Sequence, residues 1–298
     1  MKFGSITDPS KVDFALPVDH QDTRGILRAS AFKSRPSIYV GCAKWSRQSL
    51  KGFYPRGTKD ELAYYARQFN SIELNATFYT FYGKERFEVW SDKTPDDFKF
   101  FPKVNRMISH LKRLNDDVGR YTEEFCHSLA GFGEKLGVVF LQLHDNFAPK
   151  NWERLEKFLE NFPKGIPLAV EVRHTDWLND PKLSDRFYAL LEKYQVINII
   201  TDTAGRRDLL HMRLTTPSAF IRFVGANHKS DYSRLDDWFE RIKFWIETGG
   251  IEAIYFFVHQ NLEKASPLLS TYFINRLNNE LGFDLPLPAV QKELTLKF

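Results

Sequence analysis

Short apolar segments alternate with amphipathic stretches along most of this chain, and the alternation constrains its fold more than any other feature. The apolar segments are rich in β-branched and aromatic residues, which is typical of buried strands. Between them, apolar residues recur three and four positions apart, the spacing of helices with one buried face. Strands that alternate with helices favour a parallel sheet, because each helix carries the chain back to the start of the next strand. The predicted strands are residues 38–45, 71–78, 98–104, 138–144, 168–174, 197–203, 219–225 and 253–259.

The number of predicted strands separates an open sheet from a closed one. Eight strand–helix repeats are what a closed parallel barrel requires, and no second apolar core is evident in the sequence. We therefore predict an α/β fold, a TIM-like (β/α)8 barrel that forms a single domain. The long connection over 105–135 contains one more helical pattern, YTEEFCHSLAGF. The other predicted helices are residues 59–69, 151–162, 183–194, 234–247 and 263–277.

The two ends of the chain lack the strand–helix pattern, and they define the predicted domain limits. Residues 1–36 are polar and end in Arg-Pro-Ser, so we expect an N-terminal extension that packs on the surface or is partly mobile. The barrel is predicted to span 37–280, and a C-terminal tail is predicted to follow over 281–298.

The composition of the chain limits the cellular compartment and the binding partners that we expect. The 43% hydrophobic content supports a large core and excludes a disordered chain. A net charge of +4, from 42 basic and 38 acidic residues, is weak evidence for nucleic-acid binding. The sequence begins without the apolar segment of a signal peptide, and no apolar run is long enough for a membrane helix. Cys42 and Cys126 have no metal-ligand spacing, so we expect a protein of the cytoplasm with no membrane partner.

A parallel barrel carries its chemistry at the carboxyl ends of its strands, in a mouth that the strand ends surround. Because side chains alternate between the two faces of a strand, the inward polar residues at these ends can be predicted. In the segment LAVEVRH (168–174), for example, Glu171 and Arg173 share one face. The same pattern returns near the end of every predicted strand, which indicates a functional mouth. The residues expected there are Trp45, Glu73, Asn75, Lys103, Gln142, His144, Glu171, Arg173, Asp202, Arg222 and His259.

Two residues outside the predicted strands are also assigned to this mouth. His110 follows the third strand and could cover the mouth, although a loop histidine is as often simply exposed. Trp177, with neighbouring aromatic residues, could form a wall on which a ligand stacks. The predicted acids and bases are equal in number, so they can pair in a buried site. Arginine also offers a planar fork for a carboxylate or phosphate ligand.

Several common classes of enzyme lack support in the sequence. There is no Walker loop, no Gly-x-Gly-x-x-Gly and no Gly-x-Ser-x-Gly motif, so nucleotide binding and an α/β-hydrolase nucleophile are not predicted. Retaining glycosidases need two closely spaced carboxyl groups, and many barrel glycosidases place them on strands four and seven. Those strand ends carry Gln142, His144 and Arg222 here, which argues against that class.

The run GCAKW…GFYP…ELAYYARQFNSIELNATFY within 41–79 resembles the opening of the domain of unknown function 72 family, also called YecE-like. Further matches are TPDDFKFFPKV, ISHLKRL, LGVVFLQL, AVEVRHTDW and FIRFVG. The resemblance covers about residues 38–275. It implies a TIM-like barrel but no reaction, because the family lacks an established activity. The residues that it supports as a shared mouth are Glu73, Asn75, Lys103, Gln142, Glu171, Arg173, Asp202 and Arg222.

The chain departs from the pattern of this family at three strand ends. His144 stands where members often have proline, and the run RFVG from Arg222 stands where they often have Arg-x-His-Gly. The run VHQN around His259 stands where they often have Phe-Asn-Asn. These departures lie near the mouth, which leaves room for a substrate or activity that differs from the typical member.

The C-terminal tail carries a separate hint about partners. Gln291, Leu294 and Phe298 faintly resemble the peptides that dock on bacterial DNA sliding clamps, although their spacing is imperfect. The alternative is a tail that packs on the barrel.

Three functional hypotheses follow from the sequence. The first is a metal-free isomerase or hydrolase that acts on a small polar or anionic ligand, sugar-like or phosphorylated. Its predicted catalytic residues are Glu73, Lys103, Glu171 and Asp202, with Glu73 or Glu171 as general acid or base. Lys103 or an arginine would stabilise developing negative charge.

The second hypothesis needs a divalent metal, and the third needs no catalysis. No cofactor is predicted in the first hypothesis, whereas in the second Glu73, Glu171, Asp202 and His259 would hold a divalent metal. That arrangement would be similar to sugar-isomerase-like or apurinic-endonuclease-like barrels. The third hypothesis is a binding module for a small ligand, or for a nucleic-acid-processing partner through the tail.

Overall fold

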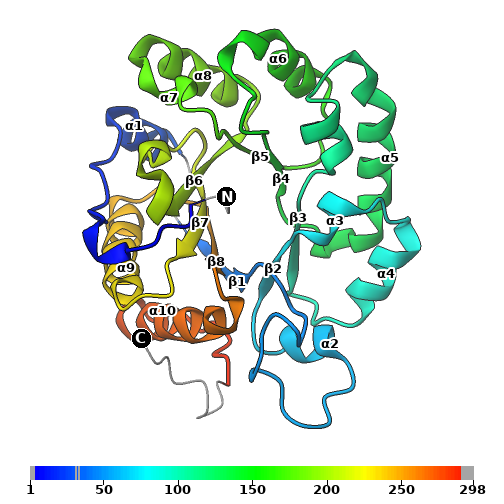
Figure 1. Cartoon of the computed structure of the whole chain (residues 1–298), viewed down its shortest axis with the longest axis vertical. Coiled ribbons are helices and arrows are strands. Elements are labelled where there is room, and N and C mark those ends of the chain that lie inside the picture. The colour runs from blue at the N-terminus through cyan, green and yellow to red at the C-terminus, as the bar shows by residue number, and fades with distance from the viewer. Residues whose placement is uncertain (1–3, 31, 33, 290–298) are drawn as a thin grey trace.

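The computed structural model describes residues 4–30, 32 and 34–289. The clamp-binding hypothesis rests on Gln291, Leu294 and Phe298, which lie outside the described residues. Eight parallel strands pair in the order β3-β2-β1-β8-β7-β6-β5-β4, and Figure 1 shows them as a ring. The predicted single TIM-like α/β barrel is thereby confirmed. The strands are β1 (Ser37–Cys42), β2 (Ser71–Leu74), β3 (Lys99–Pro102), β4 (Val139–Gln142), β5 (Leu168–Glu171), β6 (Ile197–Thr203), β7 (Ser218–Gly225) and β8 (Ala253–Gln260).

The barrel is nearly closed, and its weakest seam runs between β3 and β4. There the chain segments are joined by isolated bridges, Phe100 with Leu136 and Lys103 with Phe140, rather than by a continuous ladder. The backbone N–H of Val104 donates to the carbonyl of Phe140 at 2.9 Å. Lys103 therefore lies at the seam, just beyond the carboxyl end of β3.

Helices cover the outside of the ring, as Figure 1 shows. Several of them follow from an apolar stripe in the sequence. The stripe of α9, for example, buries Leu235, Trp238 and Ile242 against the strands. No helix in the described part of the chain is both long and apolar enough to cross a membrane. The helices are α1 (Gln21–Ala29), α2 (Glu61–Tyr65), α3 (Ala76–Tyr79), α4 (Lys84–Asp92), α5 (Gly119–Leu129), α6 (Trp152–Asn161), α7 (Asp176–Asn179), α8 (Pro181–Lys193), α9 (Ser230–Thr248) and α10 (Ser266–Leu281).

The inside of the barrel is filled by an apolar plug beneath the strand ends. Phe101 packs against Phe257 with ring centroids 4.8 Å apart, and Phe140 packs against Phe220 at 5.7 Å. Ile199 completes this inner cluster from β6. A filled interior of this kind leaves the carboxyl ends of the strands as the place where polar side chains can gather.

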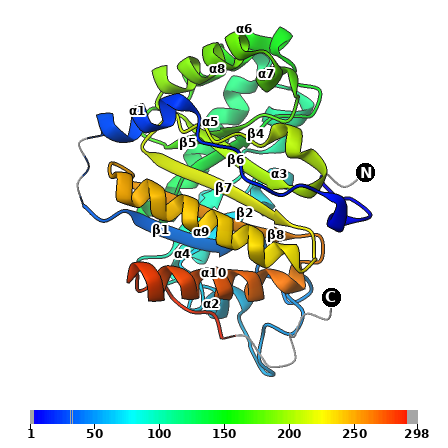
Figure 2. The ribbon, with the colours of Figure 1, turned by 90° about the vertical axis from the view of Figure 1, so that its left-hand side faces the viewer.

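The N-terminal extension packs on the barrel beside α9, as Figure 2 shows. The indole of Trp245 donates to Asp19 at 3.0 Å, and Arg241 donates to the carbonyl of Pro17 at 2.8 Å. The extension also contains α1, which the sequence pattern did not predict. The helix buries little more than Thr23 and Leu27, so it carries too few apolar positions to give a clear period.

Candidate functional site

Polar side chains from five strands form one layer directly above the apolar plug. Glu73, Gln142, Glu171, Arg222 and His259 lie at the ends of β2, β4, β5, β7 and β8. Strand register fixes part of this layer, because Gln142 pairs with Glu171 across β4 and β5. All but His259 are buried, with Glu73 fully buried and Glu171 only 1% exposed. Together with Lys103 and Arg173, these side chains are called the mouth cluster.

Arg222 is the centre of the mouth cluster. Its Nε and Nη2 donate to the two carboxylate oxygens of Glu73, both at 2.9 Å. Its Nη1 donates to Oε2 of Glu171 at 2.6 Å. Burial alone would raise the pKa of both carboxyl groups, but the arginine charge outweighs it. The pKa of Glu73 therefore lies well below its usual range, and that of Glu171 falls to about 2.

Both carboxylates have further hydrogen bonds that occupy their oxygens. Glu73 accepts from Nδ2 of Asn75 at 2.8 Å, and its Oε2 lies 2.9 Å from Nε2 of His259. Glu171 accepts from Nε of Arg173 at 3.0 Å and from the amide of Gln142 at 2.9 Å. A carboxylate held in this way is a weak base, so neither group suits proton abstraction near neutral pH.

Lys103 is the one basic member of the mouth cluster without a carboxylate partner. It is 7% exposed, and its Nζ donates to Oε1 of Gln142 at 2.8 Å. The ammonium also lies 4.2 Å from the centre of the Phe78 ring. Among the described residues, no carboxylate lies within 4.0 Å of Nζ. Burial, followed by the charges of Arg222 and Arg173, lowers the pKa of Lys103 to about 7.

Partly exposed side chains form a rim beside Lys103. The ring of His110 lies 4.8 Å from that of Phe78 and 5.1 Å from that of His144. Burial and the nearby charge of Lys103 lower the pKa of His110 to about 3, so this ring is neutral. Arg173, with its side chain 14% exposed, lies 3.8 Å from Asp145. The predicted placement of His110 and His144 at the mouth agrees with this geometry.

Asp202 is not part of the mouth cluster, contrary to the sequence-based placement. In the β6–β7 register, Thr201 pairs with Arg222 and Asp202 pairs with Phe223. Asp202 therefore faces the helix layer, where it accepts from the indole of Trp238 at 2.8 Å. The sequence-based prediction placed Asp202 on the inward face, although Thr201 lies there. Both faces of β6 are buried, so polar and apolar residues do not alternate along it and do not identify the inward face.

One predicted aromatic wall, Trp177, also lies away from the cluster. Trp177 is fully buried in the helix layer, where its indole donates to the carbonyl of Phe147 at 2.7 Å. Trp45 follows β1, and its ring lies 5.3 Å from Trp90 of α4. Phe78 does reach the cluster, because α3 places it over Lys103.

Thr201 is a member of the polar layer that the sequence reasoning missed. It shares the inward face with Arg222 and is 5% exposed. Its hydroxyl has no hydrogen-bond partner among the described residues. The segment INIITDT contains the pattern that could have identified Thr201. Ile197, Ile199 and Thr201 lie on one face of the strand, and the residues between them lie on the other.

The geometry does not favour the metal-dependent hypothesis. Within the described ranges, no three histidine, cysteine, aspartate or glutamate side chains come together in a way that could hold a metal ion. Of the four proposed ligands, Asp202 faces the opposite side of the sheet, and the oxygens of Glu73 and Glu171 are already held by arginine. A metal at this site would have to displace Arg222.

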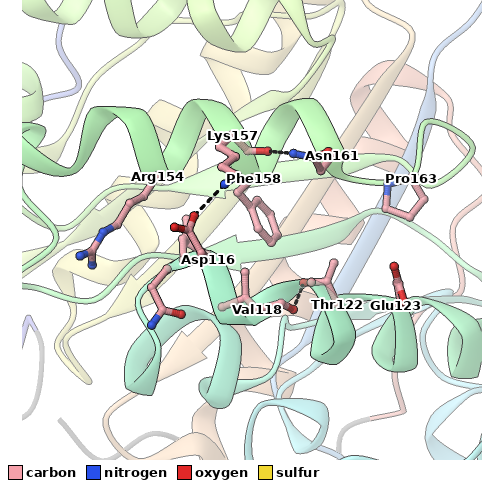
Figure 3. Close-up of a pocket in the computed structure, with 12 residues that line it drawn as sticks. Asp116, Val118, Thr122, Glu123, Arg154, Lys157, Phe158, Asn161 and Pro163 are labelled. Atoms are coloured by element: carbon pink, nitrogen blue, oxygen red, sulfur yellow. Dashed lines mark hydrogen bonds and ion pairs between the residues drawn. The ribbon is translucent and has the colours of Figure 1, made fainter.

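A hollow on the outside of the barrel, between α5 and α6, is distinct from the mouth (Figure 3). Val118 and Phe158 line it, and Lys157 and Asp116 form an ion pair across it at 2.8 Å. Both charged side chains are mostly exposed. An exposed pair of this kind contributes little to binding or stability, so this hollow is not a candidate active site.

Comparison with known proteins gives a consistent family assignment. The model of the family described as "Protein of unknown function DUF72" matches residues 39–292. The protein UPF0759 YecE of Escherichia coli K12 is 27% identical over 283 residues, which covers 87% of this chain and 99% of that protein. UPF0759 protein YunF of Bacillus subtilis is 26% identical over 152 residues, 48% of this chain and 53% of that protein.

Solved structures give the same fold. A DUF72 family protein of Thermotoga maritima aligns with a TM-score of 0.68 and 26% identity, covering 82% of this chain and 100% of that one. Another, from Enterococcus faecalis, aligns with a TM-score of 0.68 and 20% identity, covering 86% of this chain and 100% of that one. The matched region begins after the N-terminal extension.

Proposed function

The chain belongs to the DUF72 family, and we propose that it is an enzyme that transfers protons on a small anionic ligand, sugar-like or phosphorylated, in the barrel mouth. The proposed reaction needs no resident metal. Lys103 is the proton-transferring residue in this proposal. The observation that carries the proposal is that Lys103 is a buried amine without a carboxylate partner, at the carboxyl ends of the strands.

The charges of the mouth cluster support an anionic ligand. The buried acids are Glu73 and Glu171, whereas the bases are Arg173, Arg222 and Lys103. Both buried acids are engaged by the two arginines, so the charge of Lys103 has no carboxylate partner when the amine is protonated. A buried charge without a partner is costly, and an anion that reaches Lys103 would remove that cost. Arg173, at the rim, could share the same anion through its guanidinium fork.

The acid–base properties of the cluster support Lys103 rather than a glutamate as the proton-transferring group. A general acid or base works best when its pKa is close to the working pH. Glu171 has a pKa of about 2 and His110 of about 3, whereas that of Lys103 is about 7. We therefore propose Lys103 as the base in place of Glu73 or Glu171, the residues expected from the sequence. The glutamates instead hold Arg222, which lies beside Lys103.

An isomerase is favoured over a hydrolase. Hydrolysis by paired carboxyl groups needs one of them free to activate water, and both glutamates here are engaged by Arg222. Proton transfer between neighbouring atoms of a bound ligand needs only one group that can give and take a proton. Lys103 satisfies that requirement.

Calorimetric titration with sulfate tests the anion site. Sulfate is a useful probe because it does not change protonation near neutral pH. Wild-type protein should bind sulfate at pH 6.5, and Lys103→Met should lose that binding. Lys157→Met is the matched control, since Lys157 is an exposed lysine paired with Asp116 outside the barrel, and it should bind as wild type does. Equal binding by wild type and Lys103→Met would refute the proposal.

A further inference from the structure

We propose that Lys103 is a nucleophile that forms an imine with a small carbonyl compound carrying a carboxylate or phosphate group. This inference rests on the proposed function, because it assigns the substrate class of the same mouth. An amine can attack a carbonyl group only when it is unprotonated and can be approached. The surroundings of Lys103 bear on the first of these conditions, its protonation state.

The environment of Lys103 disfavours its protonated form. The side chain is buried beneath the Phe78 ring, and Gln142 provides its one hydrogen-bond acceptor among the described residues. Two arginines of the mouth cluster, Arg173 and Arg222, add like charge. Desolvation and a neighbouring cation are the two ways in which proteins activate a lysine as a nucleophile.

Lys135 shows what a structural lysine looks like in the same chain. Its side chain is 13% exposed, so it too is largely buried. Its Nζ donates to the carbonyls of Ser91 and Thr94, both at 2.8 Å, and lies 3.8 Å from Asp96. These partners stabilise an ammonium ion, whereas a single amide oxygen leaves the Lys103 amine free to use its lone pair.

The mouth also offers groups that a carbonyl substrate would satisfy. Arg173 at the rim can bind a carboxylate or phosphate. The hydroxyl of Thr201 is buried on the inward face without a partner, and a buried polar atom of this kind is unfavourable until it is hydrogen-bonded. The oxygen atoms of a bound substrate would provide that partner. Because the pKa of Lys103 is about 7, a large share of the amine is unprotonated at neutral pH.

The proposed step balances without an oxidant or a reductant. The lone pair of Lys103 Nζ forms a bond to the carbonyl carbon, and the carbonyl oxygen takes up a proton. The nitrogen then loses a proton, and the oxygen leaves as water after a second protonation. The resulting protonated imine withdraws electrons from the adjacent carbon and makes its hydrogen more acidic. Nζ of Lys103 has no lone pair in this adduct, so the role of Lys103 in this step is that of the nucleophile.

Reductive trapping tests the imine. Wild-type protein is incubated at pH 7 with glyoxylate or with pyruvate, reduced with sodium borohydride, digested and analysed by peptide mass spectrometry. The expected result is a reduced adduct on Lys103, well ahead of Lys135 and the exposed lysines. The adduct should be absent from Lys103→Arg, in which the surface lysines provide the internal reference.

Two outcomes would overturn the inference, and they differ in what they say of the proposed function. If sulfate binds but neither carbonyl compound modifies Lys103 beyond the level of Lys135, the imine is refuted while the anion site stands. If sulfate does not bind and no adduct forms on Lys103, both proposals fail.

Discussion

Two buried clusters of charged side chains lie on opposite faces of this barrel wall, and they differ in how their charges are arranged. The outer cluster joins β6 to α9. Arg234 lies 2.9 Å from Asp202 and 3.0 Å from Asp231, and Arg207 also pairs with Asp202. Two acids meet two bases, and the indole of Trp238 donates to Asp202. The ion pairs of this cluster match in charge.

The mouth cluster also consists of arginines and carboxylates, but it includes a lysine that has no carboxylate partner. Arg222 holds Glu73 and Glu171 as Arg234 holds its two aspartates. Beyond this core, Gln142 leads to Lys103, which has no carboxylate to pair with. In the outer cluster every buried charge has a partner of opposite charge, as expected of a structural cluster. In the mouth cluster Lys103 has no carboxylate partner, as expected of a site that binds an anionic ligand.

The largest expected effect is the loss of stability on replacing the central arginine of either cluster. Arg222→Leu and Arg234→Leu should each lower the free energy of unfolding by about 3–5 kcal/mol, since each removes an arginine that two buried carboxylates share. Urea unfolding at pH 7 measures both. A loss below about 1 kcal/mol for either variant would mean that its carboxylates find other partners and that the arginine does not hold the cluster together.

Lys103→Met should have the opposite effect on stability from the two arginine variants. It removes a buried charge that has no carboxylate partner, so the variant should be more stable than the wild type. At pH 6 we expect a gain of about 1–3 kcal/mol in the free energy of unfolding. The pKa of Lys103 is about 7 in the folded protein and about 10.4 in an unfolded chain. Between these values the unfolded state binds more protons, so wild-type stability rises with pH and the advantage of the variant shrinks.

The pH series supplies the control for that prediction. Urea unfolding at pH 6, 7.5 and 9 should show the difference between wild type and Lys103→Met falling by roughly 1 kcal/mol per pH unit above pH 7. Lys157→Met, which removes an exposed lysine, should show no such trend. A destabilised Lys103→Met at pH 6 would indicate that this lysine is a structural residue.

A smaller effect is expected at Thr201, whose hydroxyl lacks a partner. Thr201→Val should raise the free energy of unfolding by about 0.5–2 kcal/mol and weaken sulfate binding. Thr77→Val is the matched control, because the single proton of the buried Thr77 hydroxyl has two carbonyl acceptors in reach, Leu74 and Lys103, and its loss should cost about 1 kcal/mol. Equal destabilisation of both variants would show that the Thr201 hydroxyl is already satisfied.

The smallest effect is expected at His110. Because its pKa is about 3, this ring stays neutral between pH 5 and 7 and cannot contribute charge to anion binding. His110→Gln should therefore change the free energy of sulfate binding by less than about 1 kcal/mol, with the same pH dependence as wild type in calorimetric titrations. A binding midpoint near pH 6 that disappears in the variant would contradict this view.

The sequence predicts the barrel and most of the mouth because two of its signals are strong. Strand–helix alternation is repeated often enough to define the fold. Inward alternation places Glu73, Glu171 and Arg222 correctly because each is a charged residue in an otherwise apolar strand. The helix α4 was missed because its face toward the barrel carries one buried residue, Phe87, which is too little for a helical period.

The remaining features depend on contacts between distant segments. In β6, both faces are buried and both carry polar residues, so the pattern could not assign Asp202 and Thr201 to their faces. The state of Lys103 depends on its place at the β3–β4 seam and on arginines from β7 and from beyond β5. No local pattern encodes those cross-barrel neighbours.

The most direct test of the unmatched charge is the pKa of Lys103 itself. Protein labelled in its lysine side chains can be titrated by NMR, with the Lys103 signal assigned from its absence in Lys103→Met. We predict a midpoint near 7, which should rise when sulfate is present because a bound anion stabilises the ammonium form. A midpoint near 10.4, the value of an ordinary lysine, with or without sulfate, would show that the amine is fully matched and would contradict the proposed role of the mouth cluster.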